Sequence, residues 1–168
     1  MKYEFKLCKR FVTAKAGKPA FEFLAGYIQG NVPYTKLFAG RGTFVNYSIT
    51  VPNTFETMGT NEFLSDRYFA AFYTHDLGRL FIRKQRFQPQ ILLVNRLGFG
   101  SLSNNANHFD FYYKTMEKGY FETGLVLKNI FRFHYIGIGA GVFYRYGPYA
   151  YLEEGKNIAV KLALSFNF

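Results

Sequence analysis

Residues 157–168 read NIAVKLALSFNF, and in this stretch apolar side chains alternate with small or polar ones. One face carries Ile158, Val160, Leu162, Leu164, Phe166 and Phe168, and the other carries Asn157, Ala159, Lys161, Ala163, Ser165 and Asn167. A period of two predicts a β-strand and fits no helix. The stretch is about twice as long as an average strand and reaches the roughly 9–11 tilted residues that cross a bilayer. We therefore expect a membrane strand with its apolar face toward lipid. The alternative is an ordinary core strand at a chain end.

The composition agrees with a membrane β-barrel. The 168 residues include 14 Tyr, 21 Phe and 16 Gly but no Trp, and the mean hydropathy is −0.10. Barrels place aromatic side chains in girdles at both membrane interfaces, so many aromatics are expected there. No run of about 18 apolar residues occurs, which excludes a transmembrane helix.

The net charge of +10 comes largely from predicted turns. The basic residues concerned are Lys9, Arg10, Lys15, Lys18, Arg79, Arg83, Lys84 and Arg86. Basic turns at a membrane surface lie near anionic headgroups. We therefore predict outer-membrane lipid as a partner and no nucleic acid.

Little in the sequence indicates catalytic or metal chemistry. Cys8 is a single cysteine, which excludes a disulfide framework and a thiolate metal site. His75, His108 and His134 are scattered and lack metal-ligand spacing. We predict no cofactor, no metal and no enzymatic activity.

The same alternation predicts seven strands along the chain. They cover residues 3–12, 20–29, 63–76, 90–100, 120–128, 134–146 and 157–168, with a tight turn at Asn129. The connections alternate between short turns and long loops at 30–62, 101–118 and 147–156, which is typical of outer-membrane barrels. The predicted fold class is all-β, a transmembrane antiparallel β-barrel.

Seven strands do not close such a barrel, because the bilayer does not tolerate an open, lipid-exposed edge. The first 20 residues also lack the apolar core of a signal peptide. We therefore expect residues 1–168 to be the C-terminal segment of an incomplete barrel whose upstream strands and signal peptide are missing.

The end of the chain resembles the C-terminal recognition strand of bacterial outer-membrane proteins. The resemblance assigns Leu164, Phe166 and Phe168 to the assembly signal. It implies that the protein resides in the bacterial outer membrane and that the outer-membrane assembly machinery is a partner.

Further stretches resemble BamA-type assembly and translocation barrels. Residues 40–44, GRGTF, are similar to the motif that this superfamily carries on a loop folded into the lumen. Residues 91–100, ILLVNRLGFG, resemble its acid-plus-glycine strand, with Asn95 where the acid is expected. Residues 139–149 and 161–168 are similar to its last hairpin.

A closer resemblance is to an uncharacterised Bacteroidota family. It rests on EFLSDRY at 62–68, TMEKGYFE at 115–122 and FYRYGPY at 143–149. Full-length members place a carboxypeptidase-regulatory-like domain before an outer-membrane barrel. The two resemblances imply a BamA-like role in protein insertion or translocation, with a periplasmic or secreted protein as partner. The alternatives are an outer-membrane enzyme, such as a lipid A hydrolase or acyltransferase, and a structural or interaction barrel, each with its active part upstream.

Three charged residues form a candidate polar row in the predicted lumen: Arg41, Glu122 and Lys161. With a turn near Asn129, Glu122 is expected opposite Gly139 and Lys161 opposite Gly141. A carboxylate in a narrow lumen is costly unless it is paired. We expect a basic nitrogen within ~4 Å of the Glu122 carboxylate. The alternative is a wide, water-filled lumen in which Glu122 is simply solvated.

Overall fold

A computed structural model describes residues 1–12, 17–43, 49–79, 87–103, 113–134 and 136–166. The strands are β1 (Lys2–Arg10), β2 (Lys18–Ile28), β3 (Phe38–Ala39), β4 (Leu64–Ser65), β5 (Arg67–Arg79), β6 (Gln90–Ser101), β7 (Met116–Phe133), β8 (Ile136–Tyr146) and β9 (Ile158–Phe166). Two short 3-10 turns, η1 (Tyr34–Lys36) and η3 (Glu154–Asn157), complete the described elements. Within these residues, no helix has the length and apolar character needed to cross a membrane.

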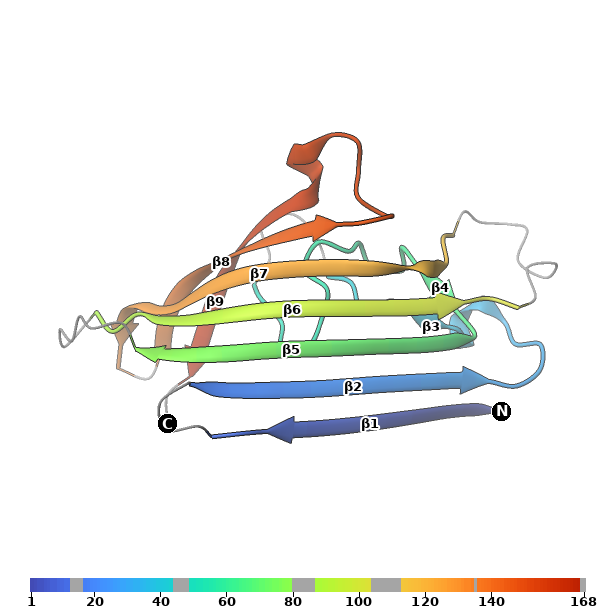
Figure 1. Ribbon diagram of the computed structural model, residues 1–168, viewed down its shortest axis with the longest axis horizontal. Coiled ribbons are helices and arrows are strands. Elements are labelled where there is room, and N and C mark those ends of the chain that lie inside the picture. The colour runs from blue at the N-terminus through green and yellow to red at the C-terminus, as the bar shows by residue number, and fades with distance from the viewer. Residues whose placement is uncertain (13–16, 44–48, 80–86, 104–112, 135, 167–168) are drawn as a thin grey trace.

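The seven long strands form one antiparallel sheet in the order β1-β2-β5-β6-β7-β8-β9. Each strand pairs with its neighbour along the chain, so the connections are hairpins or loops and never crossovers. The predicted all-β class and the seven antiparallel strands are confirmed. The sheet is curved but not closed, and β1 and β9 form its two edges (Figure 1).

The predicted turn at Asn129 is wrong. β7 continues through this residue to Phe133, and the chain reverses only before Ile136. Asn129 has φ 55°, and the pairing of β7 with β8 shifts register between Leu127 and Phe131. Asn tolerates this left-handed conformation better than most residues, so it serves here in a β-bulge inside a long strand.

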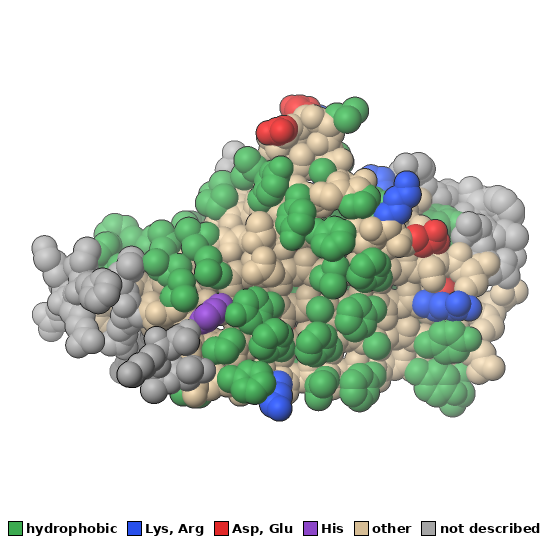
Figure 2. Space-filling model, in the orientation of Figure 1, with side chains coloured by type: hydrophobic (Ala, Val, Ile, Leu, Met, Phe, Trp, Pro, Cys, Tyr) green, Lys and Arg blue, Asp and Glu red, His purple; other side chains and the backbone are tan. Residues whose placement is uncertain are grey.

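The two faces of the sheet differ sharply in exposure. On β9, the side chains of Val160 and Leu162 are 62% and 56% exposed, whereas Lys161 between them is 2% exposed. The outer face carries exposed apolar side chains along its length, and Figure 2 shows them spread over the strands that face the viewer. The alternation predicted for the C-terminal strand is thus present, while Asn167 and Phe168 lie outside the described residues.

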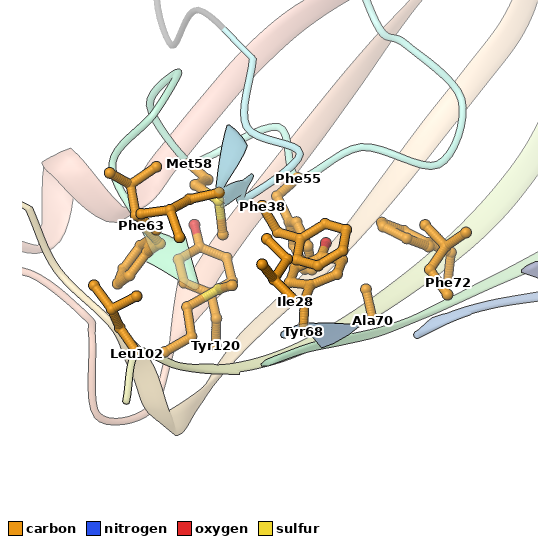
Figure 3. Packing of buried hydrophobic residues seen from close by; sticks show 14 residues of the cluster. Ile28, Phe38, Phe55, Met58, Phe63, Tyr68, Ala70, Phe72, Leu102 and Tyr120 are labelled. Carbon is orange, nitrogen blue, oxygen red and sulfur yellow. The ribbon is translucent and has the colours of Figure 1, made fainter. Parts of the chain in front are cut away.

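The chain between β2 and β5 lies against the inner, concave face of the sheet (Figure 1). We call its described residues 30–43 and 49–63 the interior segment. It contains η1 and β3, and β3 pairs with β4 immediately after the segment ends. Buried side chains of the segment and of the sheet form the main apolar core (Figure 3).

Candidate functional site

Apolar side chains seat the interior segment on the sheet. Phe55, Met58 and Phe63 are fully buried. The ring of Phe55 lies 5.2 Å from Phe72 on β5 and 5.1 Å from Tyr120 on β7. Burying each such side chain stabilises the folded state by roughly 1.5–3 kcal/mol.

Glycines on the inner face of the sheet allow the interior segment and the adjoining β4 to pack closely against the strands. A Cβ added at Gly98 would lie 2.9 Å from the Phe55 ring, and one at Gly100 would lie 2.1 Å from the Ser65 hydroxyl. A Cβ at Gly26 would lie 2.4 Å from the Phe38 ring. Glycine is used here for close approach of a second chain segment to the strand backbone.

Glu122, on the inner face of β7, holds the backbone of the segment. Its carboxylate accepts hydrogen bonds from the Glu56 amide at 3.1 Å and the Thr57 amide at 2.7 Å. The Thr57 hydroxyl donates a further bond of 2.5 Å. Arg96 on β6 completes the set with a 2.8 Å ion pair. These donors and the cation offset the free energy that burying a carboxylate without partners would cost.

Glu56 extends the same network across the sheet. Its fully buried carboxylate lies 2.8 Å from the Lys161 ammonium on β9 and 3.8 Å from Arg96. It also accepts the Val51 amide at 2.8 Å and the Thr43 hydroxyl at 3.1 Å, and Lys161 donates to the same hydroxyl.

We name this arrangement the central clamp: Lys161, Glu56, Arg96 and Glu122. It contains two cations and two carboxylates, so its formal charges cancel. It joins β6, β7 and β9 through one residue of the interior segment. A balanced buried network of this kind is destabilised by roughly 3–5 kcal/mol when one partner is removed, because a buried charge is left uncompensated.

A second clamp lies at the end of the sheet that carries the long loops. Arg145 of β8, which is almost fully buried, donates to the Glu62 carboxylate at 3.0 and 3.3 Å. The guanidinium also lies 4.8 Å from the Tyr120 ring and 4.4 Å from the Tyr151 ring. Lys114 approaches the same carboxylate at 3.4 Å. This clamp fixes the C-terminal end of the interior segment.

A third clamp joins the segment to β1 and β2. The buried Glu22 carboxylate of β2 lies 3.0 Å from Lys6 and 3.8 Å from Arg41. It also accepts the Asn53 side-chain amide at 2.8 Å and the Cys8 thiol at 3.1 Å. Two parts of the interior segment, near Arg41 and near Asn53, are therefore tied to one wall residue.

The structure brings the predicted polar row only partly together. Glu122 has the basic partner expected of it, but that partner is Arg96. Lys161 joins the same network through Glu56, whereas Arg41 lies apart on Glu22.

The register explains the difference. Glu122 pairs with Arg145 of β8 and not with Gly139, because β7 is longer than predicted. Lys161 does pair with Gly141 as predicted.

Several site residues were missed from sequence. Arg96 shares its parity with Leu92 and Val94, which was a signal that it faces inward. Glu56 and Glu62 had no such signal, because they lie in or beside an irregular segment whose partners are distant in the chain.

The other predicted residues lie as follows. Leu164 is half-buried on β9, and the backbone of Phe166 pairs with Ile136. In the GRGTF motif, Gly42 forms a bridge to Phe55, while Phe44 is outside the described residues. Asn95 faces outward and accepts a bond from Thr123 at 2.9 Å, so the acid that holds the interior segment comes from β7 instead.

The arrangement can hold a chain segment against a β-sheet wall by charge. Among the described residues, no group of three or more His, Cys, Asp or Glu side chains is placed to hold a metal ion. Comparisons with protein-family models, with curated proteins and with solved structures find no match to the chain.

Proposed function

We propose that this chain is the C-terminal part of a bacterial outer-membrane β-barrel, and that the barrel acts, like BamA-type proteins, in inserting or translocating other proteins. The contrast between the two faces of the sheet carries the proposal. Exposed Val142, Val160 and Leu162 alternate with buried Phe143, Ala159 and Lys161 on the last hairpin. Lipid-out alternation over strands of 9 to 18 residues is the pattern of membrane barrels.

The partners follow from this location. Outer-membrane lipid would cover the exposed apolar face, since soluble proteins rarely leave a contiguous apolar face of this extent open to water. The assembly machinery would read the C-terminal residues Leu164, Phe166 and Phe168. A periplasmic or secreted protein would be the cargo.

The interior segment supports the BamA-like assignment. A long loop that carries a Gly-Arg-Gly motif and folds against the inner wall is what the resemblance implies. A structural or interaction barrel is the second candidate, and it is favoured by the three clamps, which hold the segment firmly against the wall.

Lipid contact can be measured with single tryptophans, because the chain contains none. Val160→Trp and Leu162→Trp should be strongly quenched in vesicles of dibrominated phosphatidylcholine. Leu152→Trp, at the tip of the loop before β9, is the matched control and should stay unquenched. Equal quenching at all three positions, or none at Val160 and Leu162, would contradict the membrane location.

The activity needs a separate experiment in cells that make the full-length protein. Depletion should lower the amounts of other outer-membrane barrels or of secreted proteins if the chain acts in insertion or translocation. Unchanged amounts would favour the structural barrel.

A further inference from the structure

A cleft of about 400 Å³ lies between β1, β2 and the interior segment. Its apolar lining includes the buried side chains Leu24, Leu37, Phe38 and Tyr68. The rings of Phe38 and Tyr68 are stacked, with centroids 6.0 Å apart and planes 17° from parallel (Figure 3). The volume falls within the range of about 300–1,000 Å³ that small-molecule sites occupy.

The charged side chains of this cleft are mostly basic. Lys2, Lys6 and Arg41 line it, and Glu4 is the acidic residue among its lining side chains. Lys2 lies 4.2 Å from the centre of the Phe38 ring and 3.1 Å from Glu4. The cleft is therefore positive above an aromatic floor.

Behind the lining, Glu22 does not cancel this charge. Lys6 at 3.0 Å and Arg41 at 3.8 Å share its single carboxylate. Asn53 and Cys8 also donate to this carboxylate, which reduces what it offers to either cation. Lys6 and Arg41 keep about half of their side-chain surface exposed and can turn toward a second anion.

One neutral polar group adds to the lining. The Tyr68 hydroxyl is buried beside the backbone amide of Arg41, which can only donate to it, and no acceptor for the Tyr68 proton lies within the part of the chain that the structure describes. A buried donor without a partner costs free energy, so an acceptor brought by a ligand would be favoured here.

We propose that this cleft binds a small molecule that joins a planar apolar body to one anionic group, such as an aromatic carboxylate. The body would lie against Phe38 and Tyr68, and the anion would be bound by Arg41 and Lys6. An arginine fork matches a carboxylate with two parallel hydrogen bonds. This site goes beyond the proposed role in the membrane and does not depend on it.

The test uses ¹⁹F NMR on the folded chain in detergent, with 4-(trifluoromethyl)benzoate as the probe. The neutral 4-(trifluoromethyl)benzamide has nearly the same shape and reports uptake by the apolar floor or by detergent alone. The benzoate should bind about tenfold more tightly, because charge-assisted hydrogen bonds are made only by the anion.

Two variants locate the binding. Arg41→Gln combined with Lys6→Gln should remove the preference for the benzoate, whereas Lys118→Gln combined with Lys156→Gln, outside the cleft, should leave it unchanged. Ala39→Phe fills the cleft without altering charge and should weaken both probes, which keeps the test decisive if the first variant folds poorly. Equal affinity of the two probes for the unmodified chain, or benzoate binding that survives Ala39→Phe, would overturn the proposal.

Discussion

Glu122 holds the interior segment through the backbone as well as through charge. The amides of Glu56 and Thr57 both point at its carboxylate. Any residue except proline would supply the same backbone amide at position 57, although the threonine adds a hydroxyl donor. Position 56 also needs a carboxylate to pair with Lys161. The central clamp therefore depends on side-chain identity at Glu56, Arg96, Glu122 and Lys161.

Lys161→Met tests the clamp at its β9 end. The substitution keeps the length and apolar stem of lysine. Among the described residues it leaves the fully buried Glu56 with one cation, Arg96 at 3.8 Å, and with its hydrogen bonds from Val51 and Thr43. We expect the free energy of unfolding to fall by about 3–5 kcal/mol. The measurement is urea unfolding of the protein in detergent or vesicles.

Lys156→Met is the matched control for this change. Lys156 pairs with Glu153 at 2.6 Å, but both side chains are more than half exposed. Exposed pairs contribute roughly 0–1 kcal/mol, so its loss should be small. Similar losses for the two lysines would show that the clamp adds no more than a surface pair.

Gly100→Ala tests the close approach of β4, which follows the interior segment, to β6. The new methyl group would meet the Ser65 hydroxyl at 2.1 Å and its Cβ at 3.0 Å. Overpacking of this kind costs about 1–3 kcal/mol. Gly155→Ala, where nothing lies within 4 Å of the added Cβ, should change the unfolding free energy little. A neutral Gly100→Ala would mean that Ser65 and β4 move aside freely.

At the residue scale, physical reasoning predicted that Glu122 has a cationic partner but did not identify the residue that supplies it. Desolvation required a cation near Glu122, and Arg96 is that cation. Its identity depended on the pairing of β6 with β7, in which Arg96 stands directly opposite Glu122. It also depended on Glu56, whose charged partners are more than 30 residues away in the chain.

At the scale of the strands, sequence parity was sufficient to assign the faces. Period-two alternation placed Ile158, Val160 and Leu162 on one face and Ala159 and Lys161 on the other, as the exposures have them. The end points were less predictable, because a strand end depends on where its neighbour stops. β7 illustrates this, since Gly119 with φ 83° and Asn129 with φ 55° lie inside it.

Leu162→Arg tests the direction of the outer face. In the proposed membrane orientation the charge would meet lipid, which costs about 2–4 kcal/mol near the midplane. We expect the inserted fraction, measured by resistance to urea extraction from membranes, to fall strongly. Ala163→Ser, one residue further and on the buried face, should insert normally. Normal insertion of Leu162→Arg would place this face outside the lipid.

At the scale of the whole molecule, the open sheet has two edges with different protection. The edge of β9 is met at Leu162 by a parallel bridge from Ile49 and by the Thr50 amide at 2.7 Å. β1 is exposed along all nine residues. Unprotected strand edges recruit other strands, so β1 is the edge at which we expect the isolated chain to associate.

The direction of the backbone N–H and C=O groups decides at which residues of β1 a proline would block the open edge. The Phe11 amide donates to Pro19 and the Gln29 amide donates to the Met1 carbonyl, so the odd residues of β1 direct their backbone groups to β2. By alternation, the even residues direct theirs to the open edge. Glu4→Pro therefore removes an amide from the open edge, whereas Phe5→Pro removes one that bonds within the sheet, where Phe5 pairs with Ala25.

We expect residues 1–168 to form concentration-dependent oligomers in detergent, as measured by sedimentation velocity. Glu4→Pro should shift the distribution toward the monomer with little loss of unfolding free energy, because the hydrogen bonds between β1 and β2 remain. Phe5→Pro should instead lower the unfolding free energy by about 1–3 kcal/mol, because it removes a hydrogen bond between β1 and β2 and leaves an acceptor on β2 unpaired. If the oligomers persist unchanged in Glu4→Pro, the association occurs through the β9 edge or through the apolar outer face. Alternation directs the backbone groups of Val160 to the β9 edge and its side chain to the outer face. Val160→Pro would then be compared with Val160→Ala, which shortens the side chain and leaves the edge amide, so an effect of the proline alone assigns the association to the β9 edge.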